Sequence, residues 1–187
     1  MTQASILVAR AIFPEVLEML SQHFQIESNQ SDEVLSAEVL KQKMHGKVGA
    51  LTTGSERIDA ALLQANPQLK IVANMAVGYN NFDVPAMTAL GVLATNTPDV
   101  LTETTADFGF ALLMATARRI TESEHYLRQG LWTKWSYDMF AGAEVHGSTL
   151  GIIGMGSIGQ AIARRAKAFG MSIHYHNRKP VHQSTEL

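Results

Sequence analysis

Short runs of aliphatic and β-branched residues alternate with longer segments of helical periodicity over roughly the first half of the chain. Strands are predicted over residues 5–10, 25–27, 47–52, 69–73 and 92–94. Helices are expected to begin at Pro14 and near Ser36, to include Ile58, Leu62 and Leu63, and to run from about 83 to 90. Alternation of this kind is typical of parallel strands joined by crossover helices. The pattern therefore predicts a small, five-stranded, doubly wound α/β unit.

The pattern changes after Pro98, where a long apolar helix is predicted over 102–119 without an intervening strand. A second helix is predicted over 120–129, followed by an irregular stretch over 131–147 that holds both tryptophans. The strand and helix alternation resumes with a strand at 150–153, a helix at 157–169 and a strand at 171–176. We therefore expect one domain over residues 1–97 and the start of a second over residues 98–187.

Composition narrows the class of protein. The chain has 187 residues, 46% of them hydrophobic, and no cysteine. A disulfide framework, a thiolate nucleophile and any cysteine-ligated zinc site are therefore excluded. The longest apolar run is about half of the roughly 20 residues that a membrane span needs. The N-terminal residues lack the pattern of a secretory signal, so a cytoplasmic protein without a membrane partner is expected.

Charge is distributed unevenly along the chain. The net charge is −2, but residues 149–187 carry five Lys and Arg side chains against one Glu. Five cations without interleaved aromatic residues are too few to indicate a nucleic-acid partner. A small anionic ligand is the better interpretation of this basic segment.

A glycine-rich turn follows the predicted strand at 150–153. Gly154, Gly156 and Gly159 form the pattern G-x-G-x-x-G, with Ser157 and Ile158 between the last two glycines. The first glycine allows a tight turn, the second lets a pyrophosphate approach the backbone, and the third permits close packing of helix on strand. The N-terminus of the following helix favours an anion. The pattern predicts dinucleotide binding, although a structural glycine turn, or the related turns of methyltransferases and flavoproteins, would share it.

The end of the next strand bears on the choice of cofactor. An acidic residue about 20 positions past the first glycine would bind the ribose hydroxyls of NAD. The sequence instead reads Asn177, Arg178, Lys179. A guanidinium can bind a 2′-phosphate, which a carboxylate would repel. The sequence therefore predicts NADP(H) over NAD(H), with a solvated turn before Pro180 as the alternative.

Three separate segments resemble one enzyme family. NMAVGYNNFD at 74–83, NTPDVLTETTAD at 96–107 and the glycine-rich turn are similar to the D-isomer-specific 2-hydroxyacid dehydrogenases, in their glyoxylate/hydroxypyruvate and 2-ketogluconate reductase branch. The resemblance implies a flavodoxin-like substrate domain followed by a Rossmann domain. It also implies that NADPH reduces a 2-oxo acid such as glyoxylate, hydroxypyruvate or 2-ketogluconate to the D-2-hydroxy acid.

The resemblance also assigns residues. Val77 and Gly78 match the loop whose backbone N–H groups bind the substrate carboxylate, and residues 156–158 match the pyrophosphate turn. Residues 177–179 match the ribose-end loop. Two positions depart from the family pattern. Family members often have Asp where this chain has Asn80, and Arg where it has Ser157. The missing arginine implies a modestly weaker pyrophosphate contact.

The family's catalytic arginine, glutamate and histidine lie beyond the segment that this sequence matches. We therefore assign no catalytic residue and expect a C-terminally truncated, inactive chain; the alternative function is a dimerising or weak dinucleotide-binding module. His174 and His176 alternate on one strand, but no third ligand is near, so no metal site is expected. Glu103 and Asp107 are interpreted as structural, since acids are favoured in the first turns of a helix.

The predicted helix over 102–119 and the segment with Trp132 and Trp135 resemble the region through which family members form dimers. A helix that is apolar on most faces needs cover on most faces. A homodimer is therefore expected, with an intramolecular core helix as the alternative.

Overall fold

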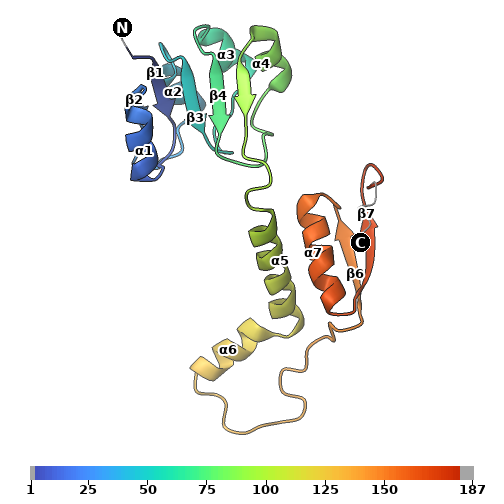
Figure 1. The fold of residues 1–187 in the computed structure, drawn as a ribbon. Helices are drawn as coiled ribbons and strands as arrows, with labels where there is room; N and C mark the ends of the chain where they lie inside the picture. Colours follow the sequence, from blue (N-terminus) through green and yellow to red (C-terminus); the bar gives the residue numbers. More distant parts are fainter. Residues whose placement is uncertain (1–2, 182–187) are drawn as a thin grey trace. The chain divides into compact units, whose positions relative to one another are not determined.

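The computed structural model describes residues 3–181 of the chain. Two compact units are present, Met1–Val100 and Leu101–Leu187, and Figure 1 shows the elements of each. Within the described residues, no helix is both long enough and apolar enough to cross a membrane.

The first unit is built on one parallel sheet. Its strands are β1 (Ser5–Val8), β2 (Gln25–Ser28), β3 (Gly49–Thr52), β4 (Ile71–Asn74) and β5 (Leu93–Thr95). They lie in the order β2-β1-β3-β4-β5 and all pairs are parallel. This is the flavodoxin-like strand order. The predicted five-stranded, doubly wound fold is thus confirmed, with strand ends that differ from the prediction by one or two residues.

Four helices connect these strands: α1 (Pro14–Ser21), α2 (Ala37–Lys43), α3 (Ala60–Ala65) and α4 (Val84–Leu90). The direction of strand addition reverses after β2, so right-handed crossovers put α1 on one face of the sheet and α2, α3 and α4 on the other. Figure 1 shows α1 in front of the sheet and α2 behind it. The core on the α2 side includes Leu40, Met44 and Leu63 packed against Leu7 and Val72.

Side chains cap the N-termini of α2, α3 and α4, whereas α1 has no side-chain cap and begins with Pro14. Ser36 accepts a hydrogen bond from the Val39 N–H, as the predicted start near Ser36 requires. Asp83 caps α4 by accepting from the Ala86 N–H. The prediction for α3 was wrong, because Ile58 lies before the helix. Asp59 caps α3, and the fully buried Ile58 forms an isolated bridge with Phe82 instead.

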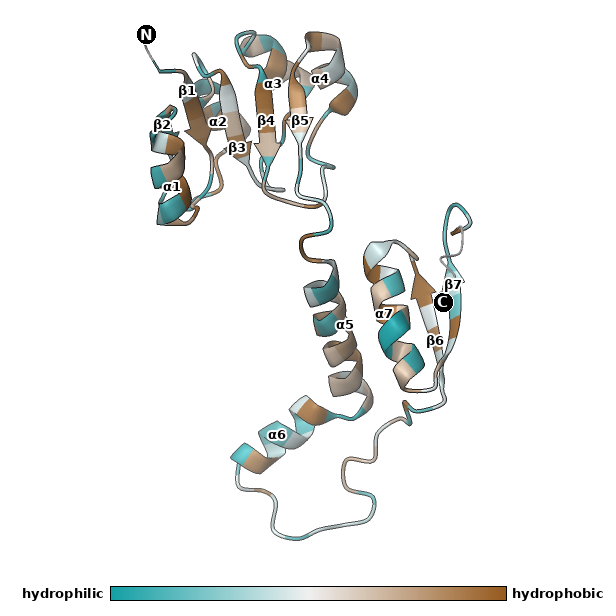
Figure 2. Cartoon of the chain, in the orientation of Figure 1, coloured by the Kyte–Doolittle hydropathy of each residue, from teal (hydrophilic) through white to brown (hydrophobic). Residues whose placement is uncertain are grey.

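The second unit contains α5 (Thr102–Ala117), α6 (Ile120–Arg128), β6 (Thr149–Ile153), α7 (Ser157–Ala168) and β7 (Ser172–His176). Strands β6 and β7 are parallel neighbours. An irregular segment connects α6 to β6, as predicted. Figure 2 shows the contrast between the hydrophobic β1 and β4 of the first unit and the mixed surface of α7.

Helix α5 packs against α7 through an apolar contact and an ionic one. Phe110 is buried, with its ring 5.0 Å from that of Phe169. Glu103 pairs with Arg164 at 2.6 Å, and Asp107 accepts from Arg165 at 2.7 Å. The two acidic side chains therefore connect helices, which fits their structural interpretation.

Candidate functional site

The loop that follows β4 has its carbonyl groups fixed by the surrounding protein. The side-chain amide of Asn74 donates to the Gly78 carbonyl at 2.9 Å, and that of Asn96 donates to the Val77 carbonyl at 2.8 Å. The Thr97 N–H donates to the Ala76 carbonyl at 3.0 Å. Three consecutive carbonyl groups are thus held, which fixes the peptide planes between them.

The N–H groups of the same loop are left for a ligand. Among residues 3–181, neither Val77 N–H nor Gly78 N–H has an acceptor. A Cβ built on Gly78 would meet no atom within 4 Å. A cavity of about 200 Å³ adjoins the loop and is lined by Gly54, Ala76, Gly78, Asn80 and Asn81. Two main-chain donors beside an open cavity are what an anion requires.

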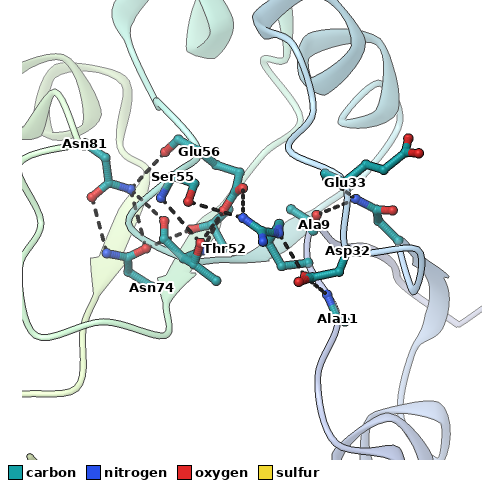
Figure 3. A network of polar contacts seen from close by, with 12 residues as sticks. Ala9, Ala11, Asp32, Glu33, Thr52, Ser55, Glu56, Asn74 and Asn81 are labelled. Atoms are coloured by element: carbon teal, nitrogen blue, oxygen red, sulfur yellow. Dashed lines mark hydrogen bonds and ion pairs between the residues drawn. The ribbon is translucent and has the colours of Figure 1, made fainter. Parts of the chain in front are cut away.

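A polar network of buried and half-buried residues supports this loop (Figure 3). The Asn81 amide donates to the carbonyls of Thr53 at 3.0 Å and Glu56 at 2.8 Å. Its Oδ1 lies 3.3 Å from the Asn74 amide nitrogen. Thr52 Oγ1 donates to Asn74 Oδ1 at 3.1 Å. These residues follow or end β3 and β4, at the carboxyl edge of the sheet, where ligands of doubly wound folds bind.

A buried carboxylate extends the network towards β1. Glu56 is 2% exposed, and its Oε2 accepts from the Thr53 N–H at 2.7 Å and the Thr53 hydroxyl at 2.9 Å. Within the described residues its Oε1 has no hydrogen-bond partner and lies 3.8 Å from Arg10 Nη1. Arg10 donates to Asp32 at 3.0 Å and to Ser55 at 3.2 Å. The Arg10 side chain, with help from the Ala11 N–H, lowers the pKa of Asp32 below its usual value.

Sequence reasoning missed this network. Arg10, Glu56, Asn74 and Asn81 were not singled out, although a signal was present: polar residues follow the apolar runs of three predicted strands. The carboxyl ends of parallel strands meet at one edge of the sheet. Their side chains were therefore candidates for a common cluster.

In the glycine-rich turn between β6 and α7, a side chain would have a different effect at each glycine. Gly154 has φ of 96°, which a residue with a side chain rarely adopts. A Cβ on Gly159 would lie 2.3 Å from the Gly154 carbonyl oxygen, so close packing leaves no room for it. A Cβ on Gly156 would meet no protein atom within 4 Å.

The beginning of α7 carries unpaired donors. Gly156 is the N-cap and supplies no side-chain cap. In the part of the chain that the structure describes, the N–H groups of Ser157, Ile158 and Gly159 have no acceptor. Helix N-termini with free N–H groups bind phosphate groups readily.

The end of β7 adjoins this turn. The Gly154 N–H donates to the His176 carbonyl at 2.9 Å. Asn177, Arg178 and Lys179 follow directly; all three are exposed and line a cavity of about 490 Å³. Neither cation has an ion-pair partner among residues 3–181. His174 and His176 are exposed, and the described chain contains no cluster of three His, Asp or Glu side chains that could hold a metal.

The structure thus groups the predicted site residues into two sets. Val77 and Gly78 belong to the first unit, and Gly154, Gly156, Ser157, Ile158, Gly159, Asn177, Arg178 and Lys179 belong to the second. A flavodoxin-like sheet joined to a strand–turn–helix with the G-x-G-x-x-G spacing defines an α/β protein of the Rossmann type.

The chain belongs to the D-isomer specific 2-hydroxyacid dehydrogenases, since the model of that family's catalytic domain matches residues 6–174. The glyoxylate reductase of Thermococcus onnurineus is 49% identical over 177 residues, which are 92% of this chain and 53% of that protein. The glyoxylate reductase of Aeropyrum pernix is 45% identical over 182 residues, 95% of this chain and 54% of its own. The chain spans about half the length of these curated relatives.

Solved structures show the same relationship. The NADPH-dependent glyoxylate/hydroxypyruvate reductase of Sinorhizobium meliloti, crystallised with NADP and malonate, superposes with a TM-score of 0.80 at 38% identity. The match covers 98% of this chain and 56% of that one. A protein from Thermus thermophilus superposes with a TM-score of 0.86 at 39% identity, over 96% of this chain and 58% of its own.

Proposed function

We propose that this chain supplies the substrate-carboxylate loop and the dinucleotide cradle of a reductase that converts 2-oxo acids to D-2-hydroxy acids. The observation that carries the proposal is the loop at Val77 and Gly78, whose N–H groups are free while its carbonyls are held. Glyoxylate, hydroxypyruvate and 2-ketogluconate are the substrates we propose. The names of the relatives, which are glyoxylate reductases, support glyoxylate, and the glyoxylate/hydroxypyruvate reductase of Sinorhizobium meliloti supports hydroxypyruvate.

The residues of the second unit fit a dinucleotide. The open space at Gly156 admits a pyrophosphate, and the N–H groups of Ser157 and Ile158 can donate to it. Gly154 and Gly159 form the turn itself. When bound, the nicotinamide supplies the hydride for reduction of the 2-oxo group.

We propose NADP(H) as the preferred cofactor. Asn177 offers an amide, and Arg178 and Lys179 offer two exposed cations without ion-pair partners in the described chain. A carboxylate at this position would favour the ribose of NAD(H) and repel a 2′-phosphate. The NADP bound to the Sinorhizobium meliloti enzyme supports the same choice.

The carboxylate loop can be tested directly on the ¹⁵N-labelled chain. Oxamate, an unreactive analogue of a 2-oxo acid, is expected to shift the amide signals of Val77 and Gly78 in a saturable titration. The alanine variant of Gly78 is expected to bind about tenfold more weakly, because its Cβ keeps the carboxylate away from the two N–H groups.

Gly151→Ala is the matched control, since a Cβ there also meets no atom within 4 Å but lies on β6. It should bind oxamate as the unmodified chain does. Shifts that sodium chloride reproduces at equal ionic strength, or equal binding by the Gly78 variant, would contradict the proposed loop function.

We further propose that the protein forms a homodimer through α6 and the segment after it. A cavity of about 400 Å³ is lined by Ile120, Ser123, Glu124, Tyr126, Leu127, Trp132, Met139 and Phe140. Trp132 is 55% exposed and Trp135 is 76% exposed. Exposed aromatic residues around an apolar cavity are typical of an interaction surface.

Trp132→Asp is expected to shift the sedimentation coefficient from that of a dimer to that of a monomer, because a charge replaces an aromatic residue that lines the apolar cavity of the proposed surface. Tyr137→Asp is the comparison: Tyr137 is 86% exposed but does not line the cavity. A monomeric unmodified chain at micromolar concentration would refute the dimer. The absence of cysteine fits a reducing compartment, and we propose the cytoplasm.

A further inference from the structure

The loop at 75–80 owes its conformation to amide side chains outside it, one of them buried and the others half-buried. Asn74, which is 2% exposed, directs its amide nitrogen to the Gly78 carbonyl. Asn96, at the end of the next strand, does the same for Val77. In a trans peptide the C=O of one residue and the N–H of the next lie in one plane and point in opposite directions. The held Ala76 and Val77 carbonyls therefore set the directions of the Val77 and Gly78 N–H groups, and the bond from Asn74 fixes the peptide plane that follows Gly78. The free donors of the loop therefore depend on how well these amides are fixed.

Asn81 joins the loop to a second segment. Both hydrogens of its amide nitrogen are used, one for the Thr53 carbonyl and one for the Glu56 carbonyl. Its amide group also faces that of Asn74, with 3.3 Å between donor and acceptor. Figure 3 shows Asn81 and Asn74 side by side, with Glu56 and Thr52 next to them. Asn81 thus bridges the turn after β3 and the loop after β4.

The turn at 53–56 is itself rigid. The Glu56 carboxylate accepts from both the N–H and the hydroxyl of Thr53, at 2.7 and 2.9 Å. The carboxylate is buried, and charge-assisted hydrogen bonds are stronger away from water. A continuous path of hydrogen bonds therefore runs from Glu56 through Asn81 and Asn74 to the Gly78 carbonyl.

We propose that Asn81 is a positioning residue for substrate: its amide holds the carboxylate loop so that the Val77 and Gly78 N–H groups remain available to the ligand. The inference deepens the function proposed above and rests on it. Asn81 lines the cavity beside Gly78, but both hydrogens of its amide nitrogen are used by the Thr53 and Glu56 carbonyls, so we infer that it acts through Asn74 and the loop. Its contribution is therefore to ligand affinity and to the direction of two N–H bonds, in addition to any effect on stability.

Asn81→Asp tests this role, because it replaces a donor with a carboxylate that faces two carbonyl oxygens. We expect oxamate affinity, followed at the Val77 and Gly78 amides, to fall about tenfold, since the loop loses its anchor. We also expect residual dipolar couplings of these two N–H bonds to change in the ligand-free chain.

The chain offers a matched control in Asn66. It is 1% exposed, and its amide likewise donates to two carbonyls, those of Leu62 at 3.0 Å and Lys41 at 3.3 Å. It ends α3, and no hydrogen bond joins it to the carboxylate loop within the described residues. Asn66→Asp should lower the unfolding temperature but leave oxamate affinity and the two couplings unchanged.

Each outcome has a defined meaning. If Asn81→Asp leaves the oxamate affinity and the two N–H couplings unchanged, the positioning role is overturned. It is also overturned if Asn66→Asp loses as much oxamate affinity, because the loss would then come from general destabilisation. Because Asn81 lines the cavity, a carboxylate there would also repel oxamate directly. The uncharged Asn81→Ser variant is therefore measured in the same way, with the same expected direction, and it also serves if Asn81→Asp does not fold. If the unmodified chain does not bind oxamate, the proposed function fails, and the couplings alone decide whether Asn81 orients the loop.

Discussion

Replacing Arg178 and Lys179 together with alanine is expected to weaken NADPH binding about tenfold to a hundredfold, because the loss of one charge-assisted hydrogen bond to the 2′-phosphate costs about 1.5–3 kcal/mol. NADH binding should stay within about twofold, since NADH lacks the 2′-phosphate. Both side chains are exposed, and the described chain contains no acidic partner for either. Fluorescence titration of the two nucleotides against the unmodified and doubly substituted chains measures the ratio.

The control removes the same charge elsewhere in the second unit. Arg128 on α6 and Lys134 in the following segment are also exposed. Their double alanine variant should keep the NADPH preference of the unmodified chain. If it loses as much NADPH affinity as the Arg178 and Lys179 variant, the effect comes from net charge. If the Arg178 and Lys179 variant keeps its preference, the ribose-end assignment is wrong.

Alanine at Gly156 and alanine at Gly159 are expected to act on different properties of the protein. At Gly156 the new Cβ meets no protein atom, and φ of −79° suits any residue. Folding should be unaffected, while NADPH binding falls about tenfold or more because the methyl group occupies the place of the pyrophosphate. At Gly159 the Cβ would lie 2.3 Å from the Gly154 carbonyl oxygen.

The Gly159 variant should therefore unfold at a temperature lower by roughly 5–20 °C, since overpacking costs about 1–3 kcal/mol. Differential scanning calorimetry and nucleotide titration of both variants separate the two effects. A Gly156 variant that binds NADPH normally would show that no phosphate approaches this turn. A Gly159 variant with unchanged thermal stability would show that α7 does not pack on the turn as described.

The first unit was largely predictable because each of its elements carries a local signal. Apolar runs mark the strands, and Ser36, Pro14 and Asp83 mark the starts of helices. Ile58 was assigned wrongly to a helix because its apolar spacing with Leu62 is helical. The cap at Asp59 outweighs that spacing, and the bridge to Phe82 buries the side chain.

The end of α5 was predicted wrongly for a different reason. The apolar pattern predicts a helix to residue 119, but α5 ends at Ala117. Arg119 adopts φ of 54°, and the Ala117 carbonyl accepts a hydrogen bond from the Ala143 N–H at 2.8 Å. A contact with a segment so far along the chain leaves no trace in the local pattern.

The two candidate sites also differ in how far the sequence predicts them. The glycine turn could be found because its requirements are local in the sequence. The support of the carboxylate loop left only a weak signal in the sequence, because its residues come from three segments that meet only in the folded sheet: Glu56, the stretch with Asn74 and Asn81, and Asn96. Their individual residue types are common, and only their hydrogen bonds show what they do.

Fixing three consecutive carbonyls at 76–78 has a chemical consequence for selectivity. Such a loop distinguishes the sign of a ligand's charge and the presence of two adjacent oxygens, features that every short-chain carboxylic acid shares. Malonate, oxalate and glyoxylate should therefore compete for it on nearly equal terms. Discrimination between one 2-oxo acid and another must then arise where the remainder of the substrate lies, away from these peptide groups.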